Sequence, residues 1–166
     1  MRQMKVCMLG SFGVGKTSLV QRFVKSIFSE KYHSTLGVKV DKKELTLGDQ
    51  ALTMMLWDIH GEEAYKKVQM SYLRGASGYL LVVDGTRRET IDVAMALRER
   101  VDAEIGKLPF VLVLNKCDLH DEWEISEAML QDFLNQNIPV IRSSALSGEG
   151  VEEAFTQLAG SILSRP

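Results

Sequence analysis

Apolar residues along the 166-residue chain gather in short runs that predict β-strands. These strands cover residues 4–10, 51–58, 78–84, 109–114 and 138–142. Their apolar character is nearly continuous, which is typical of strands that are buried on both faces. Because helical patterns lie between most of them, the sequence predicts a parallel sheet with helices on both sides.

Amphipathic helices are predicted where apolar residues recur at spacings of three and four. Two long stripes of this kind are Ala94, Leu97, Val101 and Ile105, and Val151, Ala154, Phe155, Leu158 and Ile162. A shorter stripe at residues 129–134 follows Ser126, whose residue type commonly caps the N-terminus of a helix.

Residues 38–47 break this alternation. They read as a strand that turns at residues 48–49 directly into the strand at 51–58, which predicts an antiparallel hairpin. The apolar phase shifts between residues 38–40 and 45–47, so we expect a β-bulge or an exposed edge there. No repeat or linker divides the sequence, and we expect a single domain over residues 1–166.

Composition excludes several classes of protein. A net charge of −2 argues against nucleic-acid binding through a basic surface. Apolar runs such as residues 110–114 are far shorter than the ~20 residues that span a bilayer. A strand close to the first residue, Arg at position 2 and a C-terminal end without cysteine predict no signal peptide and no encoded lipid anchor. With two scattered cysteines and no disulfide framework, we expect a cytoplasmic monomer.

Residues 10–17, Gly-Ser-Phe-Gly-Val-Gly-Lys-Thr, form a candidate phosphate-binding loop between a predicted strand and a predicted helix. The glycines let backbone N–H groups curl around phosphates, and Lys16 supplies a cation to the β- and γ-phosphates. The Thr17 hydroxyl is placed to ligate Mg²⁺. By itself this motif predicts a nucleoside triphosphate and leaves adenine-nucleotide kinases and ATPases open.

Residues 115–118, Asn-Lys-Cys-Asp, indicate which base is bound. The Asp118 carboxylate can accept two hydrogen bonds from guanine N1–H and the 2-amino group, whereas adenine offers no such pair of donors. A polar turn after a buried strand often contains Asn and Asp, so this motif alone is weak. Because both motifs directly follow apolar strands, we interpret the chain as a binder of GTP and GDP.

Three further segments fit such a site. Asp58 closes a buried strand and is the expected partner of Mg²⁺ through water, and the backbone N–H of Gly61 can reach the γ-phosphate. The polar stretch at 28–37 has no regular period, and its Thr35 could give Mg²⁺ a second hydroxyl when GTP orders the loop. A backbone N–H near Ala145 fits the guanine O6. The alternative readings are an ordinary polar loop after the strand at Asp58 and a small-residue turn before the next helix at Ala145, and we favour the site residues over both.

Together these residues resemble the Ras superfamily of small GTPases, most closely its Ras and Rab branches. The resemblance covers residues 10–17, 32–38, 57–61, 115–118 and 144–146. It implies a three-layer α/β P-loop GTPase domain, in which a six-stranded, mostly parallel sheet has one antiparallel edge strand and five helices. It also implies a GDP/GTP switch, slow hydrolysis of GTP, and effectors, exchange factors and activators, which we expect at residues 28–47 and 59–72.

The residues expected to bind the nucleotide are Gly13, Val14, Gly15, Lys16, Thr17, Ser18, Phe28, Asn115, Lys116, Asp118, Ser144, Ala145 and Leu146. Phe28 is included because the resemblance implies that its ring packs across the guanine. The expected metal ligands are Thr17, Thr35 and Asp58, and the expected catalytic residues are Lys16, Thr35, Gly61 and Glu62.

The chain departs from the family at the catalytic position. Glu62 stands where the family has a glutamine, residues 59–60 are Ile-His instead of Thr-Ala, and Phe12 stands where Ras-like members have glycine. A missing lipidated tail fits a prokaryotic relative or a shortened chain. We expect slow intrinsic hydrolysis because a carboxylate cannot donate a hydrogen bond to the transition state and adds negative charge near the γ-phosphate.

Two alternatives remain from the sequence. One is a GTP/GDP-binding scaffold module with negligible hydrolysis. The other is a P-loop kinase, for which Arg87 and Arg88 are the only candidate lid arginines. The charged run at 98–100 is expected to be a solvated helix face.

Overall fold

The computed structural model describes residues 2–25, 38–63 and 66–165. In chain order these residues form β1 (Arg2–Gly10), α1 (Lys16–Lys25), β2 (Val38–Leu47), β3 (Gln50–Ile59), the 3₁₀ turn η1 (Met70–Leu73), β4 (Gly78–Asp84), α2 (Glu89–Glu104), β5 (Phe110–Asn115), the 3₁₀ turn η2 (His120–Glu122), α3 (Glu127–Asn135), β6 (Val140–Arg142) and α4 (Val151–Leu163).

The six strands form one sheet in the order β2-β3-β1-β4-β5-β6. Every neighbouring pair is parallel except β2 with β3, which is antiparallel. The predicted fold class, a mostly parallel sheet with an antiparallel edge strand, is therefore confirmed.

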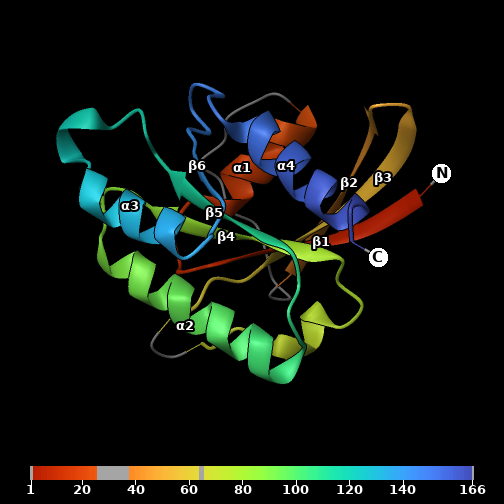
Figure 1. The fold of residues 1–166 in the computed structure, drawn as a ribbon, viewed down its shortest axis with the longest axis horizontal. Helices are drawn as coiled ribbons and strands as arrows, with labels where there is room; N and C mark the ends of the chain where they lie inside the picture. The colour runs from red at the N-terminus through yellow and green to blue at the C-terminus, as the bar shows by residue number, and fades with distance from the viewer. Residues whose placement is uncertain (1, 26–37, 64–65, 166) are drawn as a thin grey trace.

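Helices cover both faces of this sheet (Figure 1). α1 and α4 pack on one face through a cluster that includes Phe23 and Phe155, whose rings stack with centroids 4.0 Å apart. α2, α3 and η1 pack on the other face through a second cluster that includes Leu97 and Phe133. β4 is buried along its whole length, which explains its continuous apolar sequence.

The expected number of helices is wrong by one, because the described residues contain four α-helices. Between β3 and β4 their only helical piece is η1. A physical reason lies just before it: the Val68 N–H donates to the Glu62 carboxylate and is therefore not available to a helical carbonyl.

The β2–β3 hairpin has an unbroken register from Val38 opposite Ile59 to Leu47 opposite Gln50, so the edge is exposed but has no bulge within these strands. The shift in apolar phase has another cause. Leu45 and Leu47 pack on the core beneath α1 and α4, whereas Val38 packs on the core of the opposite face. Both faces of this edge strand thus contribute to a core, and no inserted residue is needed.

The ends of the parallel strands carry the candidate site. Gly10, Asp84 and Asn115 are the last residues of β1, β4 and β5, and Asp58 is the last residue but one of β3. Since ligands of open α/β sheets bind outside the carboxyl ends of the strands, the loops along this edge form the candidate site. No helix among the described residues is long and apolar enough to cross a membrane.

Candidate functional site

The loop at residues 10–17 connects β1 to α1, which begins at Lys16. At Gly15 the backbone φ is +101°, and a Cβ atom there would lie 2.3 Å from Asn115 Nδ2, so only glycine fits. The Lys16 ammonium is 5% exposed and donates to the Ser11 carbonyl at 3.3 Å. Burial lowers the pKa of Lys16 to about 8, although the nearby Asp58 carboxylate opposes this shift. A phosphate chain at the start of α1 would supply the missing counter-charge.

A hydroxyl and a carboxylate meet beside this loop. The Thr17 hydroxyl donates to Asp58 Oδ2, and Asp58 Oδ1 is buried without a hydrogen-bond partner among the described residues. Burial raises the pKa of the Asp58 carboxyl, whereas the Thr17 hydrogen bond and Lys16 lower it. This oxygen pair fits a hard divalent cation such as Mg²⁺, which commonly takes one or two protein oxygens together with substrate phosphates. The described residues hold no cluster of three or more His, Cys, Asp or Glu side chains around a metal position.

Two of the predicted site residues, Phe28 and Thr35, lie outside the described residues. The loop at 28–37 that contains them is likewise outside the described ranges. Their predicted contacts with the guanine and with Mg²⁺ stay predictions.

The residues predicted to read the base come from the loops after β5 and β6. Ser144 is buried, and its hydroxyl donates to Asp118 Oδ1 at 2.7 Å while it accepts the Ser147 N–H at 3.1 Å. Ala145 is buried in the same loop. Arg22 of α1 donates to the carbonyls of residues 146 and 147, so the helix that follows the phosphate loop also holds the loop that contains Leu146. These contacts bring the predicted residues at 118 and 144–146 together.

Asn115 connects the two halves of the site. Its Nδ2 donates to the Val14 carbonyl at 2.9 Å, and its Oδ1 accepts the Ser143 hydroxyl at 3.0 Å. Both ends of the amide are thus bonded to other loops of the protein. The residue ties the candidate phosphate loop to the loop predicted to read the base.

Asp84 is a residue of the candidate site that the sequence analysis missed. Its carboxylate is 2.8 Å from Lys116 Nζ and 3.0 Å from Arg87 Nε, and it accepts the Thr86 hydroxyl. Although burial alone would raise the pKa of Asp84, these hydrogen bonds lower it. Lys116 then donates to the Gly13 carbonyl at 3.0 Å, so Asp84 supports the phosphate loop from outside. The available signal was an acidic residue at the end of a fully apolar strand, the same signal that identified Asp58.

Arg87 extends this support to the position of the bulky substitution. Its Nη2 donates to the Phe12 carbonyl at 2.9 Å. The Phe12 side chain is 52% exposed, and its ring lies 6.2 Å from the His60 ring. The Phe12 ring thus stands at the open side of the phosphate loop.

The segment after β3 pairs with the phosphate loop through its backbone. The Glu62 N–H donates to the Gly10 carbonyl at 2.9 Å, and the Phe12 N–H donates to the Glu62 carbonyl at 3.1 Å. A Cβ at Gly61 would lie 2.7 Å from the Phe12 nitrogen and 2.9 Å from Lys16 Nζ. Gly61 is therefore placed against the lysine of the phosphate loop, and no side chain would fit there.

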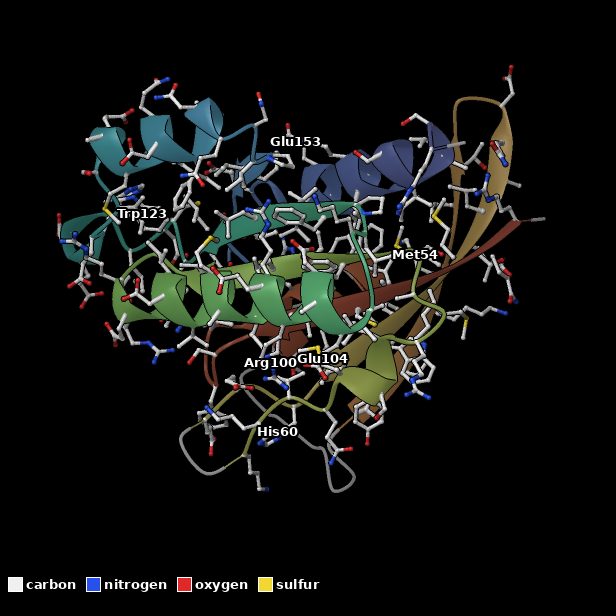
Figure 2. All side chains as sticks on the ribbon, turned by 60° about the horizontal axis from the view of Figure 1, so that its bottom comes forward. Met54, His60, Arg100, Glu104, Trp123 and Glu153 are labelled. Atoms are coloured by element: carbon white, nitrogen blue, oxygen red, sulfur yellow. The ribbon has the colours of Figure 1, made fainter. Side chains whose placement is uncertain are left out.

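The Glu62 side chain is directed toward α2. Its carboxylate is 3.2 Å from Arg100 Nη1, accepts the Val68 N–H, and is 3.5 Å from Lys67 Nζ. Figure 2 shows Arg100 on the side of α2 that faces the segment carrying His60. The expected solvated role of residues 98–100 is wrong for Arg100, which is one third exposed and has Glu62 as its partner. Sequence periodicity did not reveal this pair, because the two residues are 38 positions apart.

Comparison with known proteins gives consistent matches over almost the whole chain. A model of the Ras family matches residues 5–164. Ras-related protein Rab-4B of Rattus norvegicus is 35% identical over 165 residues, which cover 97% of this chain and 76% of that protein. Ras-related protein RABA1h of Arabidopsis thaliana is 36% identical over 160 residues, covering 95% of this chain and 73% of that protein. Ras-related protein Rab-25 of Canis lupus familiaris is 35% identical over 163 residues, covering 97% and 76%.

Proposed function

This chain belongs to the Ras family of GTP-binding small GTPases, and from that premise we propose that it is a Mg²⁺-dependent guanine-nucleotide switch with slow GTP hydrolysis. The observation that supports this proposal best is the joining of a phosphate loop and a base-reading loop at one edge of the sheet by Asn115.

Guanine recognition rests on Asp118. The Ser144 hydroxyl fixes one carboxylate oxygen at 2.7 Å and so orients the group. In this orientation the carboxylate accepts guanine N1–H and the 2-amino group, while a backbone N–H near Ala145 donates to O6. Adenine would leave the carboxylate unpaired, which costs the full desolvation of a charged group.

The triphosphate and its metal are bound by groups beside the start of α1. Lys16 binds the β- and γ-phosphates, residues 13–18 donate backbone or hydroxyl hydrogen bonds, and Gly61 offers its N–H to the γ-phosphate. Thr17 and Thr35 hold Mg²⁺, and Asp58 supports it through water. When bound, Mg²⁺ would supply positive charge to the phosphates during phosphoryl transfer.

Slow hydrolysis follows from the groups around the attacking water. A glutamine at position 62 would orient this water, but the Glu62 carboxylate only accepts hydrogen bonds and is bound to Arg100. Phe12 occupies the open side of the phosphate loop, where an activator's arginine would approach. The protein therefore hydrolyses GTP slowly and responds weakly to activators that insert an arginine.

Partners bind at residues 28–47 and 59–72, because these segments flank the γ-phosphate and change with the nucleotide. The scaffold alternative, with negligible hydrolysis, is favoured over a P-loop kinase by one observation. Arg87, a candidate lid arginine, is bonded to Asp84 and to the Phe12 carbonyl.

Single-turnover hydrolysis of radiolabelled GTP tests the proposal. We expect slow turnover in the wild type and faster turnover in Glu62→Gln, with Glu63→Gln as the neighbouring carboxylate control that keeps the wild-type rate. Wild-type turnover equal to or above that of Glu62→Gln would contradict the proposed role of Glu62. GTP binding without turnover in any variant would favour the scaffold.

A further inference from the structure

The contacts of Glu62 have a consequence for the choice between GTP and GDP. We propose that Arg100 is a positioning residue of the nucleotide site, which holds the Glu62 carboxylate against α2 and so keeps its negative charge away from the γ-phosphate. This inference rests on the proposed binding of guanine nucleotides.

The pair forms a closed set of hydrogen bonds. Arg100 Nη1 lies 3.2 and 3.4 Å from the two Glu62 carboxylate oxygens, and Arg100 Nη2 donates to the Val68 carbonyl at 2.7 Å. The Val68 N–H in turn donates to Glu62 Oε2. One guanidinium therefore binds both the Glu62 carboxylate and Val68, the residue whose N–H donates to that carboxylate. This arrangement of charge-assisted hydrogen bonds is stronger than a single exposed ion pair. Glu104, one helical turn further along α2, lies 3.7 Å from Arg100 Nε and helps to fix its orientation.

The backbone pairing of residue 62 determines the direction in which the Glu62 side chain points. Residue 62 exchanges hydrogen bonds with Gly10 and Phe12 as in a parallel bridge. In extended backbone, successive side chains point to opposite sides. Gly61 faces the Lys16 ammonium, and Glu62 accordingly faces α2.

Loss of Arg100 would leave a carboxylate that is only 11% exposed without its main counter-ion. Lys67 is well exposed and 3.5 Å away, so its attraction is weakened by solvent. A buried cation beside this segment is Lys16, whose Nζ would lie 2.9 Å from a Cβ atom built at residue 61. A released carboxylate would compete with the phosphates for Lys16 and would repel the γ-phosphate most, because that phosphate carries the charge that GDP lacks.

The test is a titration of GDP and of a non-hydrolysable GTP analogue, each with Mg²⁺, against matched variants. We expect Arg100→Met to weaken the GTP analogue relative to GDP by on the order of fivefold or more, as expected for a released charge near a partly screened site. Arg100→Lys should restore most of the wild-type ratio. In the Glu62→Gln background, Arg100→Met should leave the ratio unchanged, because no carboxylate remains to be released.

Arg98→Met is the control on the same helix, since Arg98 lies over the Phe110 ring and should keep the wild-type ratio. If Arg100→Met does not fold, Arg100→Gln retains donors for the Val68 carbonyl without the charge and should show the same shift. An unchanged ratio in a folded Arg100 variant, or an equal shift in the Glu62→Gln background, would overturn the inference. Wild-type protein that binds neither nucleotide would instead refute the proposed function.

Discussion

Asp118 provides the sharpest test at the scale of single residues. Its carboxylate is positioned by the buried Ser144 hydroxyl. We predict that Asp118→Asn weakens GDP binding by several kcal/mol, since a partly buried charged acceptor is exchanged for a donor that opposes the guanine 2-amino group. The same variant should bind xanthine diphosphate more tightly, because xanthine has a carbonyl at that position. A competition titration measures both, with Asp121→Asn as an exposed control. Unchanged GDP affinity would remove Asp118 from the base site.

Asp84 carries a second prediction at this scale. The carboxylate is 1% exposed and binds two cations, both of which also donate to carbonyls of the phosphate loop. We predict that Asp84→Asn lowers the free energy of unfolding by about 1–3 kcal/mol, the usual cost of a lost buried polar partner, and accelerates GDP release. Chemical denaturation and release of a fluorescent GDP measure the two effects. Asp49→Asn, in the exposed hairpin turn, is the control. Wild-type release in Asp84→Asn would show that Lys116 holds the loop without Asp84.

At the scale of elements, β2 is the natural surface for a partner. Among the strands that the structure describes, it pairs with β3 alone and forms an outer edge of the sheet, and Val40 is 43% exposed on it. We predict that charge reversal at Lys39 and Asp41, an ion pair of 3.6 Å, weakens the binding of an effector captured with the GTP-bound protein. Lys39 also acts to lower the pKa of the Asp58 carboxyl. GDP affinity must therefore be measured together with effector binding. Reversal of the exposed Arg142–Glu127 pair, at the opposite edge of the sheet, is the matched control. An effector that tolerates both changes at Lys39 and Asp41 would place its site elsewhere.

Local patterns predicted the elements well because each strand and helix buries a face that its own sequence defines. The strand at 78–84 and the helical stripe from Ala94 to Val101 are examples. Of the two outcomes expected for β2, the exposed edge is found and the bulge is not, because the two faces of this strand meet different cores, which the sequence does not show. The site loops were likewise predictable from their motifs, whereas Arg100 was not. Its partner depends on how α2 packs beside the segment after β3, and that is a property of the tertiary structure.

At the scale of the whole molecule, the sheet and helices form a frame whose interior is closed to solvent. Residues 79–83 of β4 and 111–114 of β5 are fully buried, with none of their surface exposed. The phosphate and base loops are tied to this frame by Asn115 and Asp84. A change of nucleotide should therefore act on the segments beside the γ-phosphate and leave the frame unchanged.

Hydrogen exchange measured with GDP and with a non-hydrolysable GTP analogue tests this division. We predict that amides at 28–37 and 59–72 exchange more slowly with the analogue, because in the proposed function only a γ-phosphate would contact Gly61 and allow Thr35 to reach Mg²⁺. Amides of β4 and β5 are the internal control, since their opening depends on global unfolding.

Within 59–72, amides near Val68 should respond least, because Val68 is already bound to Glu62 and Arg100. In Arg100→Met that local protection should be lost in both nucleotide states. Equal exchange of the two states throughout 28–37 and 59–72 would contradict a nucleotide switch and support a scaffold, while a difference spread over β4 and β5 would contradict the rigid frame.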